Sequence, residues 1–444
     1  MPAEIAVIAV AVLLVAYALV ARRLTTTPVT GPIVFVSAGM LLGPAGTDTL
    51  ADISIETLRL VVEAALVLVL FTDSAAFRLR WRRSDLELPA RLLGIGLPLT
   101  IALGTVLAAV MIGGLELWEA AALAVILAPT DGAVGQAIVS NPLVPSRIRG
   151  ALNVESGLND GIAVPFLSIL LAAGEAEASG DPMYILVTFA TALVPALLVG
   201  VVVGWTGGKL LVLAARRGWT SPGWSAVAVI AIAALTYVGA DALAASGFVS
   251  AFVGGLAFGV ATRAEMPDTP ELAEGITHLA ALIAFMVVGA AVLDPELQQI
   301  TPSMAVYALL SLTVVRMLPV AVSMIGSGLR PRTILYLGWS GPRGLATIVF
   351  ATILLLDAPG AGVTLVVTVA VLTSTISVYA HGLTAWPLSS RYGRWFRETK
   401  AAGATLAEAQ PSEPLMRRRR MEPDFVILRG GTTTEAPSDG RLSP

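Results

Sequence analysis

Cysteine is absent from the 444 residues of the chain, which excludes disulfide bonds, thiolate catalysis and cysteine-bound metal. Histidine is scarce as well, because His278 and His381 are the only two, so a histidine-rich metal site is also excluded. Charged residues make up 13% of the chain, well below the roughly 25% of soluble domains. Hydrophobic residues make up 56%, and the mean hydropathy is +0.82. This composition indicates a membrane protein with many spanning segments.

Long apolar stretches recur almost to residue 387, and each is long enough to cross about 30 Å of hydrocarbon. Arg22 and Arg23 follow the first stretch, so we interpret it as a spanning helix and not as a signal peptide. The second stretch, from about residue 33 to residue 46, is short. The sequence predicts an all-α polytopic membrane protein with about 13 transmembrane helices, centred near residues 12, 39, 66, 101, 127, 161, 198, 229, 253, 284, 314, 345 and 374.

The loop charges test this count independently, because cytoplasmic loops are enriched in Lys and Arg. With thirteen alternating spans, every second loop is basic, whereas loops such as residues 240–246 and 357–362 contain no Lys or Arg. Arg59, near the outer end of the third span, is the exception. We therefore expect an N-terminus outside and a C-terminus in the cytoplasm, across the plasma (inner) membrane. The basic loops contain residues 78–83, Arg22, Arg23, Arg147, Arg149, Arg216, Arg217, Arg263, Arg330 and Arg332.

The composition changes after about residue 387, where arginines become frequent and residues 430–444 are polar and rich in Gly, Pro, Ser and Thr. We expect residues 1–390 to form the membrane part and residues 391–444 to form a cytoplasmic, disordered tail. The four-arginine run from Arg417 to Arg420 either helps to determine topology or contacts lipid head groups.

Two of the predicted spans contain helix breakers beside an ionisable residue. Pro129 and Gly132 flank Thr130 and Asp131 in the fifth span, and residues 338–344 (Gly-Trp-Ser-Gly-Pro-Arg-Gly) interrupt the twelfth. Proline removes a backbone donor and glycine permits the reopened backbone. A pair of interrupted spans, one in each half of the chain, is typical of the mid-membrane ion site of a transporter.

Residues 153–160 (Asn-Val-Glu-Ser-Gly-Leu-Asn-Asp) place two acids in the sixth span, where a charge costs roughly 2.5–3.5 kcal/mol. Ser156 and Asp160 are four residues apart and share one helix face, as do Glu155 and Asn159. A dehydrated monovalent cation binds several oxygens. Asp160, Ser156 and backbone carbonyls are candidate ligands, together with Thr130 and Asp131 of the fifth span. An acid that holds either a proton or a cation, but not both, predicts exchange of the two.

The membrane-embedded arginines need acidic partners. We expect Arg343 to pair with Glu155, which leaves Asp160 as the one acid that titrates. Arg316 either neutralises another acid in the core or lies near the inner interface with its head group in water. Asp73, near the inner end of the third span, is a candidate for drawing cations into a cytoplasmic funnel.

At these three strings the chain resembles the monovalent cation:proton antiporters of the NhaP/NHE type. The strings are residues 128–131 (Ala-Pro-Thr-Asp), 153–160 and 338–344, and the resemblance covers about residues 1–390. It implies a thirteen-helix fold with inverted repeats and two crossed broken helices. It also implies a core at about residues 88–174 and 301–387, which moves like an elevator against the remaining helices, and a homodimer formed by those remaining helices.

The resemblance also implies roles for single residues. Asp160 is the acid that binds the cation and the proton, and Thr130 and Asp131 belong to its site. Glu155 and Arg343 form a structural ion pair. Asn159 takes the position where charge-moving relatives have a second aspartate, which favours electroneutral one-for-one exchange. Many relatives have proline after Thr-Asp, whereas this chain has Gly132, so the geometry at the first break differs.

We therefore expect a transporter, not an enzyme, that exchanges Na⁺ for H⁺ without a cofactor or a nucleic-acid partner. K⁺/H⁺ exchange is the alternative within the class, and Li⁺ is a further cation that it could carry. A Na⁺-coupled solute symporter and a channel or sensor are the alternatives outside it. The symporter would need a larger polar cavity than the sequence indicates. The channel would need a filter-like repeat, which the sequence does not contain.

Overall fold

The computed structural model describes residues 2–410, except residues 25–26, 44–46, 48–54, 78–82, 133, 136–137, 139–140, 180–181, 267–268 and 293–299. The regular elements in these ranges are all helices, which confirms the predicted all-α class. Eight stretches of helix are long and apolar enough to cross a membrane, and four shorter helices are also apolar. The predicted span centres lie in these helices or at the breaks between them. The count of thirteen spans stays a prediction.

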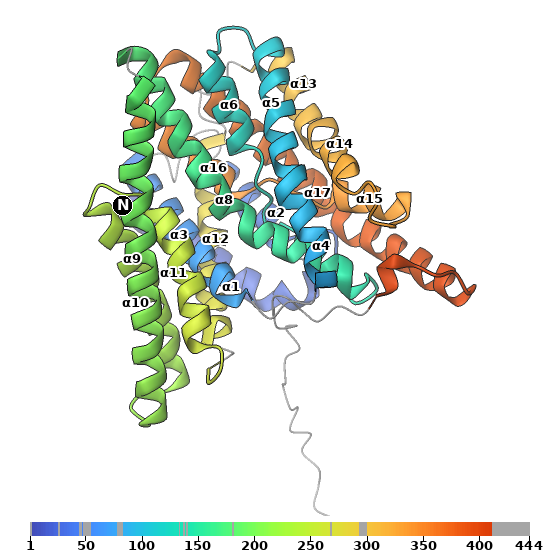
Figure 1. Ribbon diagram of the computed structural model, residues 1–444, viewed down its shortest axis with the longest axis horizontal. Helices are drawn as coiled ribbons and strands as arrows, with labels where there is room; N and C mark the ends of the chain where they lie inside the picture. The colour runs from blue at the N-terminus through green and yellow to red at the C-terminus, as the bar shows by residue number, and fades with distance from the viewer. Residues whose placement is uncertain are drawn as a thin grey trace, which may run out of the picture.

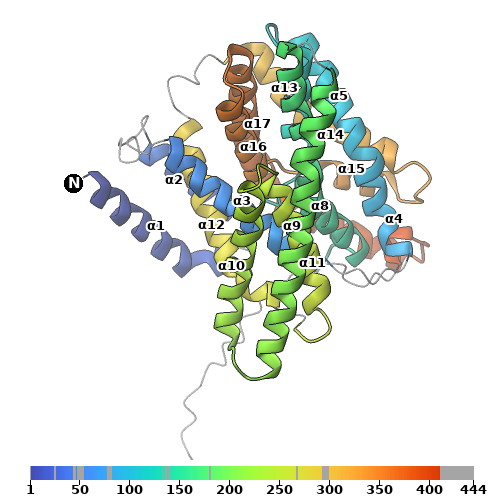
Figure 2. The ribbon, with the colours of Figure 1, turned by 60° about the vertical axis from the view of Figure 1, so that its left-hand side comes forward.

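Helices from residues 2–76 and 182–292 form one group, which we call the flanking bundle. Figure 1 shows α9, α10 and α11 of this group side by side, and Figure 2 shows α1 at its edge beside α2. The flanking bundle consists of α1 (Pro2–Leu24), α2 (Gly31–Leu42), α3 (Ile55–Ala76), α9 (Pro182–Arg216), α10 (Pro222–Asp241), α11 (Gly247–Thr262) and α12 (Thr269–Val292).

The remaining helices form a second group, which we call the site bundle because it contains both broken spans. Its helices come from two stretches of the chain that are far apart in sequence but adjacent in space (Figure 1). The site bundle consists of α4 (Arg83–Arg91), the π-helical η1 (Leu92–Gly96), α5 (Leu97–Met111), α6 (Leu117–Ile126), α8 (Ser146–Ser179), α13 (Pro302–Leu312), α14 (Val314–Ser323), α15 (Pro331–Trp339), α16 (Leu345–Asp357) and α17 (Ala361–Ala401).

Helix α6 begins with a capping box, in which the side chains of Glu116 and Glu119 each accept a backbone N–H at the helix start. It ends at Ile126, three residues before Pro129. The second broken span consists of α15 and α16, and Pro342 lies in the non-helical segment between them. Both interruptions therefore occur where the sequence predicts them.

The two bundles meet where α8 packs against α11. A Cβ atom at Gly161 would lie 2.3 Å from Cδ2 of Phe252, so only glycine permits this close approach. Ser37 of α2 and Tyr379 of α17 form a further contact between the bundles, with their hydroxyl oxygens 2.7 Å apart. The residue after Asp160 is thus in direct contact with the flanking bundle.

The end of the chain is more ordered than the sequence predicts. Helix α17 continues through Pro387 to Ala401, and a short 3₁₀ turn, η3 (Ala407–Ala409), follows it. The prediction of a disordered tail is therefore wrong for residues 391–410. The four-arginine run, from Arg417 to Arg420, lies outside the described residues.

Candidate ion-binding site

The two broken spans are joined through Asp131. Its backbone N–H donates to the carbonyl oxygen of Pro342 at 2.7 Å, which crosses the two unwound segments. One carboxylate oxygen of Asp131 accepts the N–H of Leu345 at 2.7 Å, and the other accepts the N–H of Val134 at 3.0 Å. Leu345 is the first residue of α16, so the acid of the first break caps the helix after the second. This approach requires Gly344, because a Cβ atom there would lie 2.2 Å from Oδ2 of Asp131.

Arg343 provides the reverse connection. Its Nη1 donates to the carbonyl oxygens of Ala128 and Pro129, at 2.6 and 2.8 Å, just beyond the end of α6. Its side chain is fully buried, and its backbone N–H donates to Oγ of Ser377 at 2.6 Å. A positive charge at the C-terminal end of a helix is favourable. Each break thus supplies the charged group that caps the half-helix of the other.

Glu155 pairs with Arg316, so the predicted pairing of Glu155 with Arg343 is wrong. The two side chains are bidentate, with N···O distances of 2.6 and 2.9 Å, and both are almost fully buried. Arg316 comes from α14, and its guanidinium lies against Gly341 in the second break. Arg343 instead donates from Nη1 to the carbonyl oxygens of Ala128 and Pro129. Arg316 therefore neutralises an acid in the core, which is the first of its two predicted positions, and does not lie near the inner interface.

Thr130 connects the first break to α8 through two hydrogen bonds. Its carbonyl oxygen accepts from Oγ of Ser156 at 2.9 Å, and its hydroxyl oxygen accepts from Nδ2 of Asn159 at 2.7 Å. Thr130 and Asn159 are both buried. Three of the predicted site residues, Thr130, Ser156 and Asn159, are therefore in direct contact.

Asp160 follows Asn159 in α8 and has only 7% of its surface exposed. Its Oδ1 atom has no hydrogen-bond partner among the described residues, and neither has Oδ1 of Asn159. Asp160 also forms none of the salt bridges found in the described ranges. Asp131 and the half-buried Asp73 of α3 are near enough for their charges to act on it. A buried oxygen without a partner is costly, so this position favours a proton or a cation.

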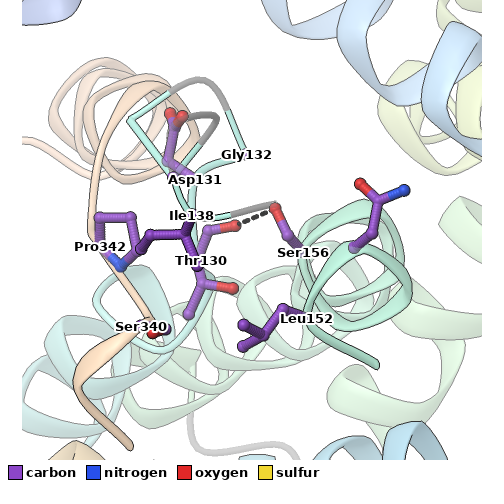
Figure 3. A pocket seen from close by; sticks show the side chains of 10 residues that line it. Thr130, Asp131, Gly132, Ile138, Leu152, Ser156, Ser340 and Pro342 are labelled. Carbon is purple, nitrogen blue, oxygen red and sulfur yellow. Dashed lines mark hydrogen bonds between the residues drawn. The ribbon is translucent and has the colours of Figure 1, made fainter. Parts of the chain in front are cut away.

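A small pocket lies beside the Thr130–Ser156 hydrogen bond (Figure 3). Figure 3 also shows the Asp131 side chain directed away from this bond, while Pro342 and Ser340 approach from the second break. Asp160 is not among the residues that line the pocket. The lining residues are Thr130, Asp131, Gly132, Gly135, Ile138, Leu152, Asn153, Ser156, Ser340 and Pro342.

The chemistry of the site suits a monovalent cation. The polar side chains here offer a carboxylate (Asp160), an amide oxygen (Asn159) and two hydroxyls (Thr130 and Ser156), and hard cations prefer such ligands. In the part of the chain that the structure describes, no cluster of three or more His, Cys, Asp or Glu could hold a metal ion. Hydrophobic packing of α8 and the two breaks surrounds the polar groups.

Sequence reasoning missed one residue at this site and assigned another incompletely. Ser377 of α17 accepts the N–H of Arg343 and contacts Nδ1 of His381 at 3.0 Å. The signal for it is a polar run, residues 373–377 (Thr-Ser-Thr-Ile-Ser), within an apolar part of the chain. Arg316 is identifiable from the sequence as an embedded charge, but no local pattern indicates which acid it pairs with.

Comparison with known proteins gives consistent results. A family model described as "Sodium/hydrogen exchanger, transmembrane" matches residues 9–389. The chain is 27% identical over 322 residues to the K(+)/H(+) antiporter NhaP of Alkalimonas amylolytica, a match that covers 72% of this chain and 55% of that protein. It is 25% identical over 334 residues to the K(+)/H(+) antiporter NhaP2 of Shewanella sp. (strain MR-4), covering 74% of this chain and 57% of that one. The chain thus spans little more than half the length of these relatives.

A solved structure is also similar. The sodium proton antiporter MjNhaP1 from Methanocaldococcus jannaschii, solved at pH 8, matches with a TM-score of 0.69 and 20% sequence identity. The match covers 88% of this chain and 100% of that chain. At 20% sequence identity, this structural similarity shows a shared fold and nothing further.

Proposed function

We propose that this chain, which belongs to the transmembrane sodium/hydrogen exchanger family of cation/proton antiporters, exchanges monovalent cations for protons at Asp160. The observation that carries the proposal is the buried Asp160 carboxylate, whose Oδ1 has no partner among the described residues. Leaving such a carboxylate ionised and unpaired in a membrane is expensive. The group must therefore be neutralised by a proton or by a cation.

The charges around the site support the same assignment. Glu155 is neutralised by Arg316, while Asp131 and Arg343 are each bound to backbone groups of the opposite break. Asp160 is the acid that remains for the transported ions. Further oxygens for the cation would come from Thr130, Ser156 and Asn159. The charge of Asp131 is close enough to act on Asp160.

The stoichiometry follows from Asn159. One acid binds either one proton or one monovalent cation, so a site with an amide beside Asp160 exchanges the two one for one and moves no net charge. Because the empty, ionised site is unfavourable in the membrane, only the loaded forms cross it, and this couples the two fluxes. In this proposal the site bundle moves against the flanking bundle like an elevator, and the flanking bundle forms a homodimer in the plasma membrane.

Sodium is the first candidate for the cation, and potassium is the second. The curated relatives NhaP and NhaP2 are named K(+)/H(+) antiporters, whereas the matched structure is named a sodium proton antiporter. The two ions differ in the size of the ligand shell that they require. The choice therefore depends on the distance between α8 and the first break when the ion is bound.

The proposal is tested in proteoliposomes that enclose a pH-sensitive dye. Separate pulses of Na⁺, K⁺, Li⁺ and choline are applied to wild type, to Asp160→Asn and to the control Asp241→Asn, whose side chain is exposed at the end of α10. We expect a proton flux with Na⁺ or K⁺ in wild type and in the control, and none in Asp160→Asn. Exchange that persists in Asp160→Asn would remove Asp160 from the mechanism. No proton flux with any cation, from folded wild type, would favour solute symport.

A further inference from the structure

The segment after α17 turns back onto the site bundle, and the short 3₁₀ turn within it has an acid, Glu408, at its centre. Glu408 has only 1% of its surface exposed, although it belongs to a short 3₁₀ turn near the end of the described chain. Its neighbour Leu406 is also buried. In Figure 1 the red end of the chain lies near α4 and the start of α8. A buried carboxylate needs a structural reason, since burial without hydrogen bonds is costly.

The reason is the N-terminus of α15. Oε1 of Glu408 accepts the backbone N–H of Arg330 at 2.8 Å and the hydroxyl of Thr333 at 2.6 Å. Arg330 is the N-cap residue of α15 and makes no side-chain capping bond of its own. In a capping box, a Glu at the third helical position would accept this same N–H. That position is Thr333 here, so Glu408 supplies from the tail the carboxylate that α15 lacks.

A second contact attaches the segment to α8. Nη1 of Arg147 donates to the carbonyl oxygen of Ala407 at 2.8 Å, and Nη2 donates to Glu87 of α4 at 3.1 Å. Arg147 is the second residue of α8 and is 4% exposed. A buried cation at a helix N-terminus is unfavourable unless such acceptors surround it. The segment therefore joins the starts of the two helices that carry the site, because α8 contains Asp160 and α15 leads into the second break.

The neighbouring part of α17 strengthens the same attachment. Tyr392 stacks on Tyr336 of α15, with ring centroids 4.3 Å apart, and its hydroxyl lies 3.1 Å from that of Thr333. Ser389 of α17 bonds to the hydroxyl of Tyr336 at 2.8 Å. The described hydrogen bonds from residues 402–410 to other elements reach α8, α15 and the end of α17, all in the site bundle. A segment bound to one bundle alone moves with that bundle and does not restrain it against the other.

We propose that residues 402–410 form a clasp in which Glu408 is a positioning residue for ion binding. The clasp holds α15, and α15 ends at the segment whose Pro342 and Arg343 bind the first break. Loosening α15 would therefore relax the segment that holds Thr130 against α8, the helix that contains Asp160. This inference rests on the proposed exchange function, because it predicts weaker cation binding and not slower movement of the site bundle.

The test compares Glu408→Ala with Glu408→Gln and with the control Glu398→Ala, an exposed glutamate at the end of α17. We expect Glu408→Ala to raise the cation concentration for half-maximal exchange by at least about threefold, with the maximal rate within about twofold of wild type. Glu408→Gln keeps the accepting oxygen and should restore most of the affinity. Glu398→Ala should resemble wild type.

A second pair of variants keeps the proposal testable if Glu408→Ala folds poorly. Glu408 accepts two hydrogen bonds from the start of α15. Thr333→Val removes the one that the Thr333 hydroxyl donates, and Thr333→Ser keeps it. Truncation after Gln410 retains the clasp and should leave the cation concentration for half-maximal exchange unchanged. Truncation after Ala404 removes Glu408 and should raise that concentration. The cation-dependent shift in Tm gives an independent measure of binding.

The outcomes separate this inference from the proposed function. Unchanged half-saturation in both Glu408→Ala and Thr333→Val would overturn the clasp, as would a fall in Tm and maximal rate without any change in half-saturation. An absence of cation/proton exchange in wild type itself would overturn the proposed function first.

Discussion

Asp131 accepts the backbone N–H of Leu345 at 2.7 Å, so an acid from the first broken span completes the first turn of the helix after the second. Arg343 makes the reciprocal contact with Ala128 and Pro129. The unfavourable ends of the two half-helices are thereby neutralised within the protein. In the proposed function, this leaves the carboxylate of Asp160 available for the transported ions.

The ion pair between Glu155 and Arg316 predicts a large effect on stability. Arg316→Ala leaves Glu155 buried without a counter-ion and should lower the free energy of unfolding by about 3–5 kcal/mol. Replacing both residues with methionine removes both charges and should recover most of this loss. Denaturant unfolding of the purified protein measures both effects. A double-mutant cycle in which Glu155 couples more strongly to Arg343 than to Arg316 would contradict the pairing.

The contact at Gly344 predicts that even alanine is too large there. The new Cβ atom would lie 2.2 Å from Oδ2 of Asp131, so the cap of α16 must shift. We expect Gly344→Ala to cost about 1–3 kcal/mol of stability and to reduce exchange strongly. Gly275→Ala in α12 is the matched control, because no atom lies within 4 Å of its new Cβ and alanine favours a helix. Equal behaviour of the two variants in unfolding and transport assays would argue against the cap.

Asn159 allows a test of the stoichiometry. In Asn159→Asp the hydroxyl of Thr130 can reverse its hydrogen bond and donate to the new carboxylate, so the fold should be retained. A second acid beside Asp160 should make exchange electrogenic. A membrane potential contributes roughly 2.3 kcal/mol per charge for each 100 mV, so the rate in valinomycin-clamped liposomes should depend on voltage. The exchange rates of wild type and Asn159→Ala should not depend on voltage. An active Asn159→Asp variant whose rate is also independent of voltage would refute the role of Asn159 in electroneutral exchange.

The absence of cysteine makes the topology directly measurable. Single cysteines are introduced at Ser221, exposed before α10, and at Ala242, exposed after it. With the N-terminus outside, an impermeant maleimide should label Ala242→Cys on intact cells and Ser221→Cys only after permeabilisation. Wild type supplies a background without reactive thiols. The opposite labelling pattern would reverse the predicted orientation.

The helices and the polar residues of the site were predictable because their signals are local. Apolar length identifies a spanning helix, and proline with glycine interrupts one, whatever the rest of the chain does. Residues 128–132 and 338–344 therefore form breaks where they were expected. The four-residue spacing of Ser156 and Asp160 likewise follows from helix geometry alone.

The order of residues 391–410 was not predictable in the same way. Their frequent charges and polar residues are typical of a disordered tail, and one buried acid among alanines gives no signal of its own. Glu408 is held in place by the start of α15, which lacks a capping acid of its own and whose N-cap residue, Arg330, lies 78 residues earlier in the chain. Complementarity between two such distant segments exists only once both have folded.

The sequence by itself determined that the chain spans a membrane, which two spans are broken and which acids lie among apolar residues. It did so because hydrophobicity, backbone breaking and charge belong to short segments. The tertiary structure alone decided which charge meets which partner: Arg316 with Glu155, Arg343 with the carbonyls of α6, and Asp131 with α16. The physical reason is that electrostatic and hydrogen-bond energies depend on distances of a few ångströms, and these distances arise only when helices more than a hundred residues apart cross.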